Sequence, residues 1–111
     1  MSTSIPEITV TDLKAAIDAQ QDCLLLDVRR PDEHAHCAIA QARLIPLAEL
    51  PQRLAEIAAY KEKPVYIHCH HGGRSAQATQ LLLQEGFTQV ANVVGGIDAW
   101  SLAIDASVAR Y

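Results

Sequence analysis

The sequence predicts an α/β domain with a mostly parallel sheet, and three observations indicate it. Short apolar runs alternate with stretches of helical periodicity along the chain, an order typical of parallel α/β folds. The run Cys23–Val28 is apolar up to an aspartate at its end, as in strands buried on both faces. The chain has 111 residues, half of them hydrophobic, which fits a single domain over residues 1–111 with its own core.

Five short segments are expected to be strands, because each is an apolar run of strand length between turn or helix signals. They are Ile8–Val10, Cys23–Val28, Arg43–Ile45, Val65–His68 and Val90–Val94. The ligands of such folds lie at the carboxyl ends of the strands, over helix N-termini. Two of these ends carry reactive side chains, namely Asp27 and Cys69.

The helices are expected between these strands. Thr11 is placed to cap a first helix, because an apolar i, i+3, i+4 pattern begins at Leu13. A second helical stripe is formed by Leu47, Leu50, Leu54 and Ile57. It contains Pro51, which a helix tolerates only in its first turn. Two further helical segments complete the pattern, one from about Arg74 to Glu85, which Gly86 would end, and a short one at Ile97–Ala103.

The charge balance excludes several classes of protein. Nine basic and 13 acidic residues give a formal charge of −4, so no basic stripe favours nucleic acid. No apolar run approaches the roughly 20 residues that span a bilayer, and the N-terminus lacks the regions of a signal peptide. We therefore expect a cytoplasmic protein without a membrane partner. Its three cysteines are expected to be free thiols in a reducing compartment.

The stretch VYIHCHHGGRSA, Val65–Ala76, contains the most reactive group of the sequence. Cys69 follows a strand, Gly72 and Gly73 allow a tight turn, and Arg74 with Ser75 opens a helix. Backbone N–H groups in such a turn form an anion-binding concavity, and the helix adds about half a positive charge. Both would stabilise the thiolate of Cys69, and Arg74 would add to the effect. The pattern therefore favours a sulfur nucleophile.

Two other interpretations of Cys69 were weighed. His68, Cys69, His70 and His71 are four potential metal ligands in a row, but consecutive side chains point in different directions and zinc ligands are normally spaced two to five residues apart. An inert buried thiol is the usual fate of a lone cysteine, but the strand-end position and the following glycines argue against it. We expect neither a metal nor another cofactor.

Three segments in order resemble the rhodanese family of sulfurtransferases. They are LLLDVRRPDE at Leu24–Glu33, VYIHCHHGGRSA at Val65–Ala76 and NVVGGIDAWS at Asn92–Ser101. The resemblance covers nearly the whole chain. It implies a rhodanese-like fold, with a central five-stranded, mostly parallel sheet flanked by helices on both faces.

The resemblance also implies roles for individual residues. Cys69 would be the nucleophile that carries a persulfide. The loop that holds it would comprise His70, His71, Gly72, Gly73, Arg74 and Ser75. His70 and His71 lie where the family varies, and they either tune the charge near the sulfur or are solvated. Asp27 and Arg29 would brace the loop and pair with Glu33, and Trp100 would pack in the core.

The implied reaction moves a sulfane sulfur from a donor such as thiosulfate to cyanide or a thiol, with ping-pong kinetics. The acceptor could be a protein sulfur carrier or a thioredoxin-like thiol. Two alternatives stay open: a non-catalytic or relay module that receives sulfur from a protein partner, and a cysteine phosphatase or arsenate reductase. The latter enzymes are typified by C-x5-R, whereas Arg74 here closes a C-x4-R.

One segment departs from the family pattern. The family commonly has G-H-I-P-G-A where this chain has CAIAQA, Cys37–Ala42, and His34 replaces the usual aromatic after Glu33. The loss of two glycines and a proline predicts a different path for this connection and for the rim of the pocket. It leaves the loop after Cys69 unchanged.

Overall fold

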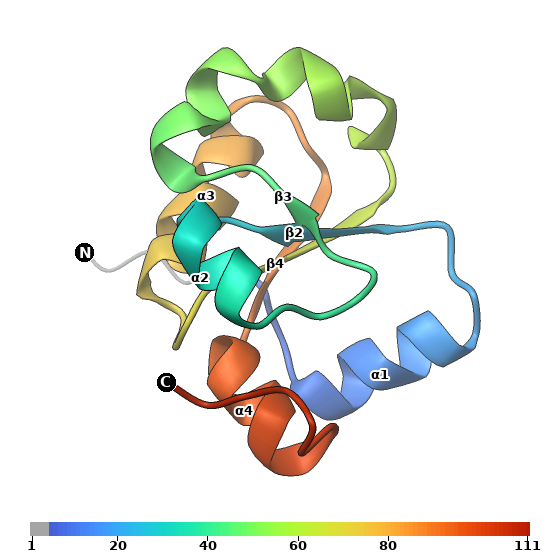
Figure 1. The fold of residues 1–111 in the computed structure, drawn as a ribbon. Helices are drawn as coiled ribbons and strands as arrows, with labels where there is room; N and C mark the ends of the chain where they lie inside the picture. The colour runs from blue at the N-terminus through green and yellow to red at the C-terminus, as the bar shows by residue number, and fades with distance from the viewer. Residues whose placement is uncertain (1–4) are drawn as a thin grey trace.

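The computed structural model describes residues 5–111, and these form a five-stranded sheet between two layers of helices (Figure 1). All neighbouring strands are parallel, in the order β1-β5-β4-β2-β3. The strands are β1 (Glu7–Ile8), β2 (Leu24–Asp27), β3 (Arg43–Leu44), β4 (Pro64–His68) and β5 (Gln89–Val93). The predicted fold class is therefore confirmed. Residues 1–4, which begin the N-terminal segment considered above, lie outside the described residues.

The centre of the sheet is the pair β2–β4, and it aligns the two strand ends that the sequence singled out. All four residues of β2 are buried, as the continuous apolar run predicts. The register places Asp27 beside His68. Because parallel strands end at the same edge of a sheet, the aspartate after the apolar run and the cysteine that follows β4 lie on one edge of the molecule.

Helices cover both faces of the sheet (Figure 1). One face packs against α1 (Val10–Asp18) and α4 (Gly96–Ala103), in a core that contains the buried Trp100. The other packs against α3 (Gly73–Gln84) and two 3₁₀ segments, η1 (Leu47–Gln52) and η2 (Leu54–Tyr60). The expected core position of Trp100 is what the structure shows. No helix among residues 5–111 is long and apolar enough to cross a membrane.

The first helix begins earlier than the sequence suggested. We expected Thr11 as its cap, but α1 begins at Val10, and Thr9 accepts a hydrogen bond from the Asp12 N–H at 3.1 Å. Both threonines suit a cap position. The difference arises because β1 ends at Ile8, so the residue predicted to end the strand becomes the first of the helix.

The stripe from Leu47 to Ile57 forms two 3₁₀ segments in place of one α-helix. Pro51 lies inside η1 and not in its first turn. Proline has no N–H to donate and its ring crowds the preceding turn. The chain accommodates it in short 3₁₀ segments, and Leu50 and Ile57 still enter the core.

A short helix that the sequence analysis did not anticipate, α2 (Pro31–His36), follows β2. Pro31 occupies its first turn, where proline is favoured, and the Glu33 carboxylate accepts a hydrogen bond from the Arg30 N–H at 3.1 Å. This helix places Glu33 in the interior, where it is 7% exposed. The motif that follows β2 thus supplies a buried carboxylate to the edge that carries Cys69.

Candidate active site

Cys69 directly follows β4 and is 2% exposed. Its Sγ accepts hydrogen bonds from the backbone N–H groups of Gly72, at 3.2 Å, and Ser75, at 3.4 Å. Ser75 belongs to the first turn of α3, where N–H groups have no acceptor within the helix. The helix N-terminus and the turn therefore both direct positive partial charge at the sulfur.

The turn after Cys69 depends on Gly72. This residue has φ +136°, a conformation that side chains rarely adopt and glycine adopts freely. It precedes the first residue of α3. The positive φ sets the direction in which the chain enters α3, directly after the N–H that faces the sulfur of a residue three positions earlier.

Asn92, in β5, holds the two residues that contact the sulfur. Its Oδ1 accepts a hydrogen bond from the Ser75 hydroxyl at 2.5 Å, and its Nδ2 donates one to the Gly72 carbonyl at 3.3 Å. The Ser75 hydroxyl oxygen lies 3.4 Å from the Cys69 Sγ. The motifs of the sequence do not predict this role of Asn92. The available signal was a polar side chain within the apolar run VANVV, because a buried polar group needs hydrogen-bond partners.

Arg74 and Glu33 form an ion pair that joins the loop to α2. Arg74 Nη1 lies 2.6 Å from Glu33 Oε1, and Nη2 lies 3.0 Å from Oε2. The hydrogen bonds from Arg74 hold the pKa of Glu33 well below its usual range, and the pair raises the pKa of Arg74. We expected the charge of Arg74 to reinforce the field at the sulfur. The structure directs that charge to Glu33, so the groups in contact with the sulfur are backbone N–H groups and a hydroxyl.

Asp27 and Arg29 form a second, fully buried pair. Arg29 Nε lies 2.9 Å from Asp27 Oδ1, and Nη2 lies 2.8 Å from Oδ2. Burial opposes ionisation of Asp27, but hydrogen bonds from Arg29 and His34 lower its pKa. We expected the Asp27–Arg29 unit to pair with the carboxylate of Glu33. Instead the backbone carbonyl is the one part of Glu33 with which Arg29 makes a hydrogen bond, at 3.3 Å. The Glu33 carboxylate is held by Arg74.

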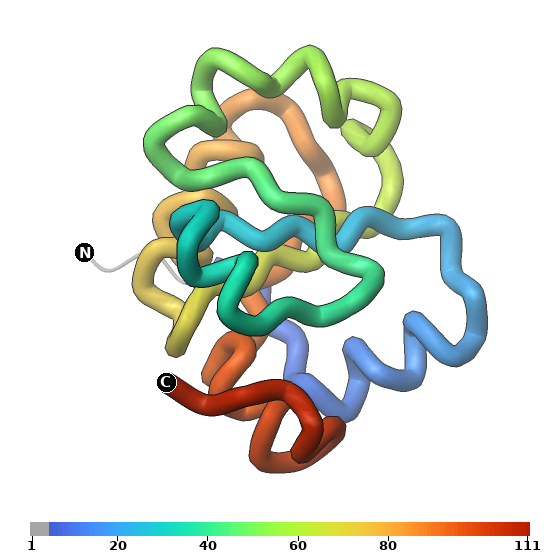
Figure 2. The backbone as a smooth tube through the Cα atoms, in the orientation of Figure 1, coloured from blue at the N-terminus to red at the C-terminus, as the bar shows by residue number. Residues whose placement is uncertain are grey.

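Tyr111 connects the two ion pairs, a role that nothing in the sequence indicated. Its hydroxyl donates to Glu33 Oε2 at 2.8 Å and accepts from Arg29 Nη1 at 2.9 Å. Burial raises the pKa of Tyr111 to about 12. Its ring stacks on His70 with 3.9 Å between centroids. Figure 2 shows the last residues running back from α4 toward the loop after β4. A lone aromatic outside any motif carries no sequence signal for such a contact.

Of the histidines around Cys69, His68 lies in the interior and His71 lies at the surface. His68 is fully buried, and burial lowers its pKa to about 4, so it is neutral at pH 7. Its Nδ1 lies 3.3 Å from the Cys69 carbonyl oxygen. His71, by contrast, has a side chain that is 68% exposed. The four consecutive residues weighed as metal ligands therefore do not converge on one point.

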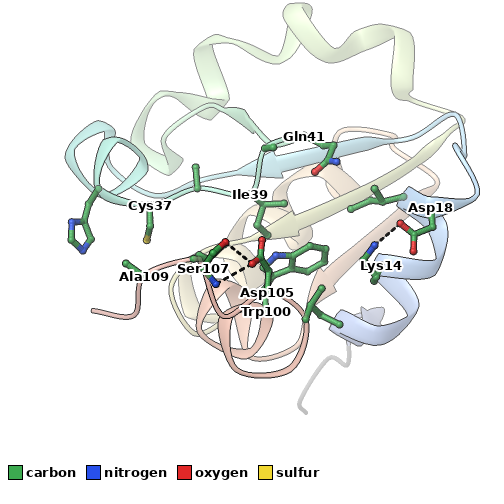
Figure 3. Close-up of a pocket in the computed structure, with 15 residues that line it drawn as sticks. Lys14, Asp18, Cys37, Ile39, Gln41, Trp100, Asp105, Ser107 and Ala109 are labelled. Atoms are coloured by element: carbon green, nitrogen blue, oxygen red, sulfur yellow. Dashed lines mark hydrogen bonds and ion pairs between the residues drawn. The ribbon is translucent and has the colours of Figure 1, made fainter.

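A cavity of about 530 Å³ lies apart from Cys69 (Figure 3). It opens between α1, α4 and the segment Cys37–Gln41, and Trp100 lines it. None of residues 69–75 does so. The segment that departs from the family pattern therefore shapes this cavity. The candidate active site is therefore identified by the groups around the Cys69 sulfur and not by this cavity.

Comparisons with known proteins agree with this geometry. The family model for the rhodanese-like domain matches residues 9–103. A sulfurtransferase of Allochromatium vinosum is 38% identical over 87% of this chain and 89% of its own length. A putative sulfur carrier protein of Bacillus subtilis, YrkF, is 36% identical over 90% of this chain, which spans about half of that relative (53%). The solved human single-domain sulfurtransferase TSTD1 superposes with a TM-score of 0.79 at 28% identity, covering 90% of this chain and 98% of that one. With this fold, these motifs and these matches, the chain belongs to the rhodanese-like domain family.

Proposed function

We propose that this protein is a sulfurtransferase that moves a sulfane sulfur from a donor such as thiosulfate to a thiophilic acceptor, through a persulfide on Cys69. The observation that carries the proposal is the pair of N–H groups, from Gly72 and Ser75, that point at the Cys69 sulfur. Such donors stabilise a thiolate before the reaction and a charged persulfide after it. The names of the relatives support transfer of sulfur as the general activity.

The first half-reaction would load the cysteine. The thiolate of Cys69 attacks the outer sulfur of thiosulfate, and a new S–S bond forms as the S–S bond of thiosulfate breaks. Sulfite leaves with the electron pair of that bond, and Cys69 becomes a persulfide with a terminal negative charge. The N–H groups of Gly72 and Ser75, at the start of α3, would supply positive potential for that charge.

The second half-reaction would unload it. Cyanide or a thiolate attacks the terminal sulfur, the S–S bond to Cys69 breaks, and the electron pair returns to the cysteine as a thiolate. The products are thiocyanate or a new persulfide. Because the two half-reactions share a covalent intermediate, ping-pong kinetics are expected. A thioredoxin-like thiol or a protein sulfur carrier would serve as the acceptor in the second step.

The position of Arg74 favours sulfur transfer over phosphate ester hydrolysis. A phosphatase loop uses its arginine to clamp the three equatorial oxygens of the transferring phosphoryl group. Here the guanidinium of Arg74 makes two hydrogen bonds with the Glu33 carboxylate, which leaves the backbone N–H groups and the Ser75 hydroxyl to bind the anion. A single additional sulfur atom requires fewer donors than a phosphoryl group.

A relay function is the second candidate, and the likeness to the putative sulfur carrier of B. subtilis favours it. A relay would receive its sulfur from the persulfide of a protein partner and would use the same loop. It differs from the enzyme in the donor that loads Cys69, so the choice of donor in the test separates the two functions.

Intact-protein mass spectrometry after incubation with thiosulfate tests the proposal. The chain should gain the mass of one sulfur atom, cyanide should remove it, and Cys69→Ser should gain none. Cys23→Ser and Cys37→Ser are matched controls that should load normally. Loading from a protein persulfide but not from thiosulfate would favour the relay. Failure to load from either donor, or loading in Cys69→Ser, would contradict both functions.

A further inference from the structure

Two loop histidines and an aspartate of α4 gather on the outer side of the Cys69 loop. One potential ligand atom from each of His70, His71 and Asp98 lies within 4.8 Å of the other two. Nε2 of His71 is 3.8 Å from Oδ2 of Asp98, and the two imidazole rings stack at 4.0 Å between centroids. The order of residues along the chain does not predict this cluster, because the histidines follow β4 whereas the carboxylate belongs to α4.

The backbone holds Asp98 in place beside the loop. The first turn of α4 donates two hydrogen bonds to the backbone of the Cys69 loop. Ile97 N donates to the Cys69 carbonyl at 2.9 Å, and Asp98 N donates to the His70 carbonyl at 3.2 Å. Gly96 makes this approach possible, since a Cβ there would lie 2.5 Å from the Cys69 carbonyl oxygen. The fold therefore holds the backbone of Asp98 beside the backbone of the histidines.

His70 has one ring nitrogen that, among residues 5–111, is without a hydrogen-bond partner. Its ring is held parallel to that of Tyr111 with 5° between the planes. Its Nε2 is buried and has no hydrogen-bond partner among the described residues. Buried polar atoms are normally paired, and an unpaired one needs an explanation such as an ion or a water. This nitrogen is an observation independent of the proximity of the three side chains.

We propose that His70, His71 and Asp98 bind a divalent transition-metal ion of the zinc class. Two imidazoles and one carboxylate are a ligand set that Zn²⁺ accepts, with water completing the coordination. Bond lengths of about 2.0–2.2 Å place tetrahedral ligand atoms roughly 3.3–3.6 Å apart, so the cluster contracts when it binds the ion. His71 supplies this movement, because its side chain is 68% exposed and free to leave its stack.

Arg110 competes with the ion for Asp98. Its Nε lies 2.9 Å from Asp98 Oδ1, so a metal must displace it or share the carboxylate with it. The arginine side chain is 58% exposed and is easily moved aside. Loss of this competitor should strengthen metal binding, a result that a non-specific surface histidine pair would not give.

The site is independent of the proposed sulfur transfer, and its test does not use activity. The full chain carrying Cys69→Ser, which removes the neighbouring thiol, is titrated with Zn²⁺ in a calorimeter and with Co²⁺ in a spectrophotometer. We expect one ion per chain, with the visible bands of cobalt bound to nitrogen and oxygen. A near-ultraviolet thiolate-to-cobalt charge-transfer band would instead identify a cysteine as the ligand and would overturn the proposal.

Variants in that background identify the ligands. His71→Ala and Asp98→Asn should each weaken the affinity by about tenfold or more, and Arg110→Ala should strengthen it several-fold. Asp105→Asn, at an exposed position outside the cluster, should leave it unchanged. Circular dichroism checks that each variant is folded. Absence of binding, an affinity that His71→Ala and Asp98→Asn leave unchanged, or an Arg110→Ala affinity no higher than the parent's would contradict the assignment.

Discussion

Arg74 of the cysteine loop and Glu33 of α2 form a two-point ion pair, with separations of 2.6 and 3.0 Å, and it ties the loop to the helix after β2. The sequence separates these residues by 41 positions. The pair fixes the first turn of α3 relative to the neighbouring strand end, because Glu33 is buried and is itself held by Tyr111. It also neutralises the only cationic side chain in the loop.

Glu33→Gln should therefore destabilise the protein. The variant keeps the size of the side chain, but it loses the charge-assisted hydrogen bonds with Arg74, which are typically worth about 2 kcal/mol. Urea unfolding of the two proteins measures the difference. Glu49→Gln, in an ion pair with Arg53 at the surface, is the matched control and should cost less than about 1 kcal/mol. Equal effects of the two substitutions would argue against a structural role for the pair with Arg74.

The same pair predicts a dependence of stability on pH. Glu33 has a lower pKa in the folded chain than in the unfolded chain, where glutamate titrates near about 4.3. The unfolded state thus binds a proton first as the pH falls, so the contribution of Glu33 is complete above about pH 5 and is lost progressively below about 4.3. The gap in free energy of unfolding between the unmodified chain and Glu33→Gln should shrink in acid. A gap that stays constant from pH 6 to pH 3 would contradict this.

Gly96→Ala should disrupt the backbone contact behind Cys69. The added Cβ would lie 2.5 Å from the Cys69 carbonyl oxygen and 2.6 Å from that of His70, and the residue has φ +58°. Strain and crowding together should cost roughly 2–5 kcal/mol and slow the loading of Cys69. Gly73→Ala is the control, because its Cβ would meet nothing within 4 Å. Thermal unfolding and the rate of sulfur loading report the two effects.

Asn92→Ala should lower the rate at which Cys69 reacts. The substitution frees the Ser75 hydroxyl and the Gly72 carbonyl from Asn92, and both of these residues donate N–H groups to the sulfur. A displacement of about 1 Å in a reacting centre can cost up to roughly 100-fold in rate, and we expect a tenfold loss or more. The rate of alkylation of Cys69 by iodoacetamide at pH 7 measures it. Gln89→Ala, at an exposed position in the same strand, should react like the unmodified chain.

Much of the fold could be predicted because its signals are local. The continuous apolar run of β2 indicated a strand buried on both faces, and its four residues are buried. The boundaries were less predictable, as Thr9 and Thr11 show, because both threonines can cap a helix and only the end of β1 decides between them. Pro51 is expected in the first turn of a helix, whereas the structure places it inside η1, one of two 3₁₀ segments that bury Leu50 and Ile57.

The amino-acid sequence by itself determined which segments form strands, the turn after Cys69 and the approximate start of α3, because apolar runs, glycines and helix periodicity act on residues close together in the chain. Only the tertiary structure decided what surrounds the sulfur. It paired Arg74 with Glu33, placed Asn92 behind the loop and brought Asp98 beside His70 and His71. These contacts join separate elements, and their geometry follows from strand order and helix packing, which the spacing of residues along the chain does not encode.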